Sequence, residues 1–141
     1  MGVVFFTMMF FDSSFLIGLF IDSDRYHDKA EDLKGILSNE VVVINNVVFN
    51  EVMNSLEMTK YGPNYNVNLE ELFDFLFNKV VFHHLSRKDY FNAYLMFKHY
   101  NQAINYSDFT ILETMMEYSI NKIVSFDSDF DKIKGLRRIY L

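Results

Sequence analysis

Four acidic side chains occupy positions at which this sequence could build a metal-binding site: Asp12, Glu51, Asp108 and Asp127. Asp12 directly follows the apolar run 3–11, and Asp127 directly follows the apolar segment 123–126. Clustered carboxylates repel one another unless a cation or a proton lies among them. Because oxygen ligands favour hard ions, such a cluster would select Mg²⁺ or Mn²⁺ over zinc. An ion held in this way can orient a phosphodiester, activate a water molecule and neutralise developing negative charge.

Each acid also has an ordinary structural interpretation. Asp12 and Asp127 would be loop acids that end strands. Asp108 would stabilise the first turn of a helix capped by Asn105, since helix dipoles favour acids there. Glu51 would lie at the edge of an apolar helical stripe. The arrangement of all four, rather than any single acid, favours a shared site.

Three further polar residues could support this site: Ser14, Ser125 and Asp129. The two serines could hydrogen-bond to the acids, and Asp129 could add an outer carboxylate. A helix cap, an ordinary strand residue and a solvated acid are the alternative interpretations of these three residues.

The elements that must position the acids follow from hydrophobic periodicity and capping signals. Apolar runs rich in β-branched and aromatic residues predict strands at 3–11, 40–44, 79–85, 122–126 and 136–140. Helical periodicity predicts helices from 13 or 14 to 20, then at 24–37, from 45 or 46 to 59, and at 69–77, 86–100 and 106–119. The clearest turn is Tyr-Gly-Pro-Asn at 61–64. Strands separated by helices predict an α/β fold with a central, mainly parallel sheet, whose ligands bind beyond the carboxyl ends of the strands.

Composition limits the function classes. The 141 residues, half of them apolar, fit one domain with a sizeable core. Cysteine is absent, so a disulfide, a thiolate zinc site and a cysteine nucleophile are excluded. Asp12, Ser13 and Ser14 interrupt the apolar stretch near the start, which makes a membrane span a poor interpretation, and we expect a cytoplasmic protein.

Other chemistries find less support. The sequence has no glycine-rich loop with a following Lys-Ser or Lys-Thr and no Gly-x-Ser-x-Gly motif. His83, His84 and His99 lack a matching acid or histidine at helical spacing, so we expect ordinary surface or boundary histidines. His27 should pack against the first helix.

The net charge of −6 is awkward for a protein that binds nucleic acid, because phosphates repel an acidic surface. Two groups of basic residues could provide local positive charge. They are Arg87 with Lys88, and the group Lys132, Lys134, Arg137 and Arg138 near the end of the sequence. Such groups are more often solvated faces than binding sites.

Five segments, in order, resemble motifs of the PIN-domain nucleases and, within them, the VapC-type toxins. They are Phe-Asp-Ser-Ser at 11–14, Tyr-His-Asp-Lys-Ala at 26–30, Asn-Glu-Val at 50–52, Tyr-Ser-Asp-Phe-Thr-Ile-Leu at 106–112 and Val-Ser-Phe-Asp-Ser-Asp-Phe at 124–130. The resemblance covers nearly the whole chain. It implies one PIN-like domain over 1–141, a three-layer α/β/α sandwich, and hydrolysis of RNA phosphodiesters by a water activated by Mg²⁺ or Mn²⁺. The implied metal ligands are Asp12, Glu51, Asp108 and Asp127.

The sequence departs from the family pattern in three places. Phe109 replaces the small residue that usually follows the third acid, so packing there must differ. Asn45-Asn46 stands where Pro-Ser or Pro-Thr often precedes the second acid. The segment 69–85 is long and aromatic. None of these departures affects the four acids.

The resemblance also implies partners. Small PIN domains often form homodimers, for which the surface near Phe15, Leu19, Phe20 and Tyr26 is a candidate, and VapC-type toxins bind an antitoxin protein. Two other functions remain open: a housekeeping PIN nuclease of RNA maturation, and a non-catalytic PIN-like protein–protein interaction module.

Overall fold

The computed structural model describes residues 7–37, 40–57 and 66–140, and contains a five-stranded sheet in which every neighbouring pair of strands is parallel. The order across the sheet is β3-β2-β1-β4-β5. The strands are β1 (Met8–Phe11), β2 (Val41–Asn45), β3 (Val81–His83), β4 (Lys122–Val124) and β5 (Arg137–Ile139). Because β1 is central and its neighbours β2 and β4 are parallel to it, the carboxyl ends of these three strands lie side by side at the same end of the sheet.

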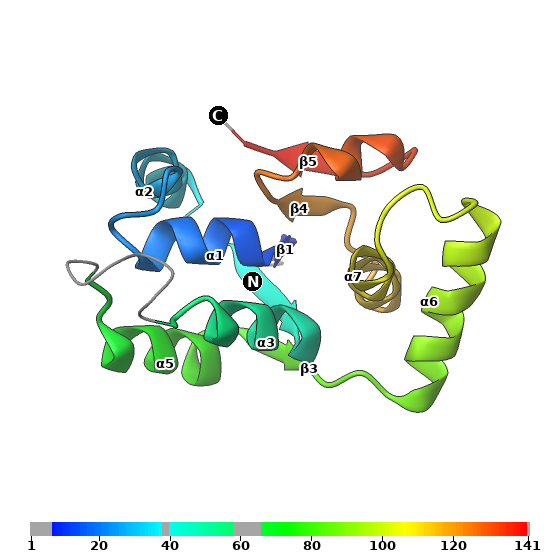
Figure 1. Cartoon of the computed structure of the whole chain (residues 1–141), viewed down its shortest axis with the longest axis horizontal. Coiled ribbons are helices and arrows are strands. Elements are labelled where there is room, and N and C mark those ends of the chain that lie inside the picture. Colours follow the sequence, from blue (N-terminus) through cyan, green and yellow to red (C-terminus); the bar gives the residue numbers. More distant parts are fainter. Residues whose placement is uncertain (1–6, 38–39, 58–65, 141) are drawn as a thin grey trace, which may run out of the picture.

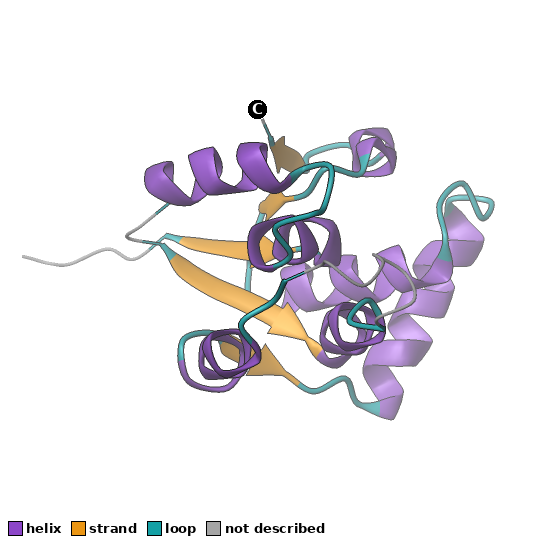
Figure 2. Cartoon of the chain, turned by 60° about the vertical axis from the view of Figure 1, so that its left-hand side comes forward, coloured by secondary structure: helices purple, strands orange, loops and turns teal. Residues whose placement is uncertain are grey.

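Helices cover the sheet on both sides (Figures 1 and 2). Helices α1, α2, α3 and α5 lie on one side, and α6 and α7 on the other. Their bounds are α1 (Ser13–Phe20), α2 (His27–Ile36), α3 (Asn46–Asn54), α5 (Leu69–Asn78), α6 (Arg87–His99) and α7 (Tyr106–Glu117), and a 3-10 helix η1 (Ser128–Lys132) precedes β5. The predicted three-layer α/β/α architecture is therefore confirmed.

The caps that begin the helices explain why the chain turns where it does. The Asn45 side chain accepts a hydrogen bond from the Val48 amide and so begins α3. The Asn105 side chain does the same for the Asp108 amide in α7. Ser86 and Asp89 form the reciprocal capping box that begins α6, at the start of the helix predicted over 86–100.

The observed elements are shorter than most of the predicted ones. Of the first predicted strand, 3–11, residues Met8–Phe11 form β1, and residues 3–6 lie outside the described residues; the third strand spans Val81–His83, against a prediction of 79–85. Helix α3 ends at Asn54. The end of its predicted range and the predicted turn at 61–64 lie outside the described residues. Flanking apolar residues extend the sequence pattern, but strand pairing ends earlier.

The core contains two residues that the sequence suggested for a pairing surface. Phe15 and Leu19 are buried at 1% and 8% exposure, so the expectation that they lie on a dimer surface is wrong. The Phe11 ring packs edge-on against Phe15, which draws the apolar face of α1 onto β1.

Among the described residues no helix is both long and apolar enough to cross a membrane.

Candidate active site

Asp12 lies where the central strand ends. It is the N-cap residue of α1, and its backbone amide donates to the Val124 carbonyl at 3.1 Å. The parallel register pairs Phe11 with Val124, so the residues after these two strands lie side by side. Asp127 follows β4 and caps η1 by accepting a hydrogen bond from the Asp129 amide at 2.9 Å. The sheet register thus brings the first and last acids to one edge.

Two serines tie these acids together. The Ser125 hydroxyl donates to Asp12 Oδ2 at 2.6 Å and accepts from the Asp127 amide at 3.0 Å. The Ser14 hydroxyl donates to the same Asp12 oxygen at 3.0 Å and accepts from the Phe126 amide at 3.0 Å. The two serines therefore fix the orientation of the Asp12 carboxylate relative to the chain that carries Asp127.

A third serine contacts the second acid, a contact that the sequence did not predict. The Ser13 hydroxyl donates to Glu51 Oε2 at 2.6 Å, joining the start of α1 to α3. Sequence reasoning treated Ser13 only as a helix cap. The one available signal is its position between Asp12 and Ser14, directly after the first strand.

Asp108 projects into the same cluster from the first turn of α7. Its side chain is 6% exposed, and, within the part of the chain that the structure describes, its Oδ2 atom is buried without a hydrogen-bond partner. One oxygen from each of Asp108, Asp127 and Asp129 lies within 4.8 Å of the others. A buried carboxylate oxygen without a partner beside two other acids is costly unless a proton or a cation satisfies it.

The raised pKa values of three of these acids also indicate that their carboxylates lie close together. Burial, followed by the charges of the other site acids, raises the pKa of Asp108 to about 7. Burial also raises the pKa of Asp12, against the opposing hydrogen bonds from Ser125 and Ser14. The pKa of Glu51 is raised by burial and by the charge of Asp12. Asp108 is thus within electrostatic reach of the other three predicted acids.

These residues fit a hard divalent ion. The donors are all carboxylate oxygens, the set that Mg²⁺ and Mn²⁺ prefer. The Asp108 oxygen without a protein partner provides a donor that the fold itself leaves unused. A cation at this position would remove the repulsion that raises the pKa values of these acids.

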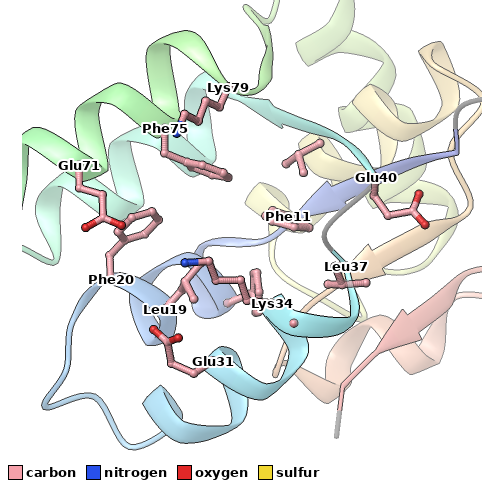
Figure 3. Close-up of a pocket in the computed structure, with 13 residues that line it drawn as sticks. Phe11, Leu19, Phe20, Glu31, Lys34, Leu37, Glu40, Glu71, Phe75 and Lys79 are labelled. Atoms are coloured by element: carbon pink, nitrogen blue, oxygen red, sulfur yellow. The ribbon is translucent and has the colours of Figure 1, made fainter.

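An apolar hollow lies between α1, α2 and α5, and its lining does not include the four acids. It has a volume of about 640 Å³, and Phe11, Phe20 and Phe75 contribute to its wall (Figure 3). Its charged lining residues are Glu31, Lys34, Glu40, Glu71 and Lys79. Its aromatic wall with mixed charges suits an amphipathic protein segment better than a phosphodiester.

The basic residues suggested for RNA binding differ in their exposure and in their ion pairs. Arg138 is held by Asp131 in a two-point ion pair at 2.9 Å, donates to the Ser125 carbonyl, and has a side chain only 8% exposed. Lys132 pairs with Asp129 at 3.1 Å. The others are exposed: Arg87, Lys88, Lys134 and Arg137. Arg138 is thus already engaged inside the fold.

An aromatic stack that the sequence did not reveal lies beside the acids. The Tyr26 ring stacks on the Phe126 ring with centroids 4.4 Å apart, and Phe126 directly precedes Asp127. The Arg25 guanidinium lies over the Tyr26 ring, 4.5 Å from its centroid. Arg25 itself is exposed. A planar cation at the end of a stack, next to the acidic cluster, is a surface on which a nucleic-acid base can stack.

The histidines also differ in their surroundings. His84 and His99 are exposed, as expected. His27 Nδ1 lies 2.8 Å from the Gly18 carbonyl in α1, which confirms its expected packing. His83 lies at the boundary of the fold, as expected, but its Nε2 atom lies close to both Asp89 and Glu117, which the sequence did not predict. Sequence spacing could not show this, since the two acids come from different helices.

Comparison with known proteins agrees with this arrangement. Residues 9–136 match the sequence profile of the PIN domain. The chain is 28% identical to Ribonuclease VapC6 of Methanocaldococcus jannaschii in an alignment that covers 89% of this chain and 92% of that protein. Among solved structures, the fold resembles VapC20 of Mycobacterium tuberculosis, described as a sarcin–ricin loop cleaving toxin, with a TM-score of 0.73, 20% identity, and coverage of 94% of this chain and 99% of that one. It also resembles a toxin–antitoxin complex from Klebsiella pneumoniae, with a TM-score of 0.65, 18% identity, and coverage of 91% and 94%. The profile match over most of the chain, with the strand order and the cluster of acids at the strand ends, shows that this chain belongs to the PIN domain family.

Proposed function

We propose that this chain is a ribonuclease that depends on Mg²⁺ or Mn²⁺, with Asp12, Glu51, Asp108 and Asp127 as the metal ligands. One observation carries the proposal: four carboxylates from four separate segments converge, and one buried oxygen, Asp108 Oδ2, has no partner among the described residues. A fold that needed these acids only for capping would leave no buried carboxylate oxygen unsatisfied.

The bound ion would supply positive charge to the phosphate and acidity to the attacking water. The protein's own groups would set the geometry. Ser125 and Ser14 orient the Asp12 carboxylate, and Ser13 orients Glu51. Such outer hydrogen bonds commonly fix how a ligand presents its oxygen. Asp129, beside Asp108 and Asp127, would be an outer acid of the same site.

RNA is the substrate class that the relatives support. The homologous protein from Methanocaldococcus jannaschii is named a ribonuclease, and VapC20 is described as cleaving the sarcin–ricin loop. The exposed Arg25 lies over Tyr26, which stacks on Phe126, and would give RNA a local contact beside the acids of a chain whose net charge is −6. Cation and aromatic faces together bind a single strand with little sequence preference.

Additional phosphate contacts would come from exposed basic residues of the two predicted groups, namely Arg87, Lys88, Lys132, Lys134 and Arg137. Lys132 lies next to the site, because its ammonium group pairs with Asp129. Arg138 is better assigned to holding η1 against β5, since Asp131 already engages it.

The biological role that we favour is the toxin of a toxin–antitoxin pair, acting on RNA in the cytoplasm. The resemblance to a solved toxin–antitoxin complex supports an antitoxin partner. The apolar hollow beside α1 and α5, with its mixed charges, would suit a segment of such a partner. Pairing with a second copy would then use the half-buried Phe20 and Tyr26 rather than Phe15 or Leu19.

The test is incubation of the purified protein with structured RNAs in Mg²⁺ or Mn²⁺, then with chelator, beside the Asp12→Asn variant. Cleavage that requires the ion and disappears in the variant supports the proposal. A protein that binds metal but cuts none of the RNAs would favour the non-catalytic interaction module. Toxicity on expression that a neighbouring gene relieves would separate a toxin from a housekeeping nuclease.

A further inference from the structure

A second group of metal-ligating side chains lies apart from the four acids. His83 Nε2 is 3.0 Å from Asp89 Oδ2 and 3.2 Å from Glu117 Oε2. One ligand atom from each of the three residues lies within 4.8 Å of the other two. The residues come from three elements: the end of β3, the first turn of α6 and the last residue of α7.

The imidazole ring is oriented toward the two carboxylates. Its other nitrogen, Nδ1, lies 3.2 Å from the Tyr118 hydroxyl, and the Tyr118 ring packs edge-on against it. A hydroxyl that accepts the Nδ1 proton would leave the Nε2 lone pair facing two anions. This is unfavourable unless a cation occupies the space between them, and an outer partner of this kind is typical of metal-binding histidines.

The group is partly shielded yet open to solvent on one side. The side chains of His83 and Asp89 are 12% and 11% exposed, whereas that of Glu117 is 48% exposed. Asp89 and Glu117 also line an open hollow of about 590 Å³ between α6 and α7. An ion could therefore enter from the Glu117 side without opening the core.

This group is separate from the proposed catalytic site. Glu117 ends α7, whereas Asp108 lies in its first turn, so the two are roughly 13 Å apart along the helix axis at 1.5 Å per residue. The ligand chemistry also differs. One imidazole nitrogen with two carboxylates suits Zn²⁺ and related transition metals, whereas an all-carboxylate set suits Mg²⁺ or Mn²⁺.

We propose that His83, Asp89 and Glu117 form a structural site for a transition-metal ion of the Zn²⁺ class. The ion joins the sheet edge at β3 to the α6–α7 pair. Because it binds only where all three elements are folded together, it stabilises the native state by a free energy that rises with the logarithm of its concentration over its Kd. The competing occupant is a proton on His83, which would make the same three residues an ordinary ion-pair network.

The experiment measures Zn²⁺ binding by calorimetry and Zn²⁺-dependent melting in excess Mg²⁺, with Co²⁺ absorption as a report on ligand geometry. The variants are His83→Gln and the half-exposed Glu117→Gln. The matched control is Glu113→Gln, which removes the same charge one helical turn away in the same hollow. Asp108→Asn tests independence from the catalytic acids.

The proposal predicts one Zn²⁺ per chain and a raised melting temperature. Binding should weaken by at least about tenfold in His83→Gln and Glu117→Gln and stay unchanged in Glu113→Gln and Asp108→Asn. Absence of Zn²⁺ binding in excess Mg²⁺, or binding unaffected by His83→Gln and Glu117→Gln, would overturn it. Binding lost in Asp108→Asn would also overturn it, because the ion would then belong to the catalytic acids. Mg²⁺-dependent cleavage of RNA tests the proposed function separately.

Discussion

Replacing Asp108 by asparagine isolates the electrostatic cost of the acidic cluster. The substitution keeps the side-chain shape and removes one buried charge. Asp108 Oδ2 has no described hydrogen-bond partner to lose, and the new amide group can donate to Asp127 or Asp129, whose oxygens lie within 4.8 Å. In the metal-free protein we therefore expect Asp108→Asn to be more stable than the parent at neutral and higher pH.

The pKa of Asp108 sets the size and the sign of this effect. Burial and the neighbouring acids raise that pKa from 3.8 to about 7 in the folded protein. A rise of about three in pKa corresponds to about 4 kcal/mol between the protonation states, of which we expect about 1–3 kcal/mol in the variant because water and neighbouring acids relax. Since the folded protein binds the proton more tightly than the unfolded chain, its free energy of unfolding falls as the pH rises from about 4 to 7, then levels off.

Thermal unfolding in chelator at pH 5 and pH 8 tests this reasoning. At pH 5 Asp108 is protonated in the folded parent but largely ionised in the unfolded chain, so the variant should melt only slightly higher than the parent, by clearly less than at pH 8. At pH 8 the variant should melt higher by roughly 4 °C per kcal/mol for a domain of this size. Asp32→Asn, an exposed acid in α2, is the matched control and should leave the melting temperature nearly unchanged.

Three outcomes would refute it. They are a destabilised Asp108→Asn protein at pH 8 in chelator, a difference between parent and variant that does not change with pH, and an Asp32→Asn effect of equal size. Any of them would mean that Asp108 stabilises the metal-free fold by an ordinary polar contact or by the helix dipole.

Three further perturbations follow from the contacts of the site. Ser125→Ala removes the 2.6 Å hydrogen bond to Asp12 and the acceptor for the Asp127 amide, so it should cost about 1–3 kcal/mol in chemical denaturation and lower the RNA cleavage rate about 10–100-fold. Arg25→Ala should leave the melting temperature nearly unchanged but raise KM for RNA, with a salt slope of binding shallower by nearly one; an unchanged slope would exclude Arg25 from the RNA path. Phe109→Ala should destabilise the fold by about 3–5 kcal/mol, because this fully buried ring packs between Phe97 and Tyr100; a cost below about 1 kcal/mol would mean that the cavity collapses or fills.

The sequence predicts most of the fold because its signals are local and consistent. Continuous apolar runs predict the parallel strands, and the caps at Asn105 and Ser86 predict where two helices begin. The convergence of Asp12 and Asp127 follows from strand ends meeting at one sheet edge. The lengths of β3, β4 and β5 were overestimated because the sequence pattern typical of strands continues past the paired residues.

Contacts between distant segments could not be predicted in this way. His83 meets Asp89 and Glu117 only because β3, α6 and α7 end near one another, and no spacing along the chain encodes that meeting. The Tyr26–Phe126 stack and the Ser13–Glu51 hydrogen bond are likewise tertiary contacts. Phe15 and Leu19 were assigned to a surface because an amphipathic pattern does not distinguish a core from an interface.

The central claim is that one divalent ion, held by the four acids, is what allows this chain to cut RNA. Its most direct test is to measure Mn²⁺ binding and RNA cleavage in the same samples of the parent and of Asp12→Asn, with His83→Gln as a control whose substitution lies outside the site. We predict that Asp12→Asn loses Mn²⁺ binding and cleavage together, whereas His83→Gln keeps both. Cleavage that persists in chelator, or in an Asp12→Asn protein that no longer binds Mn²⁺, would contradict the account.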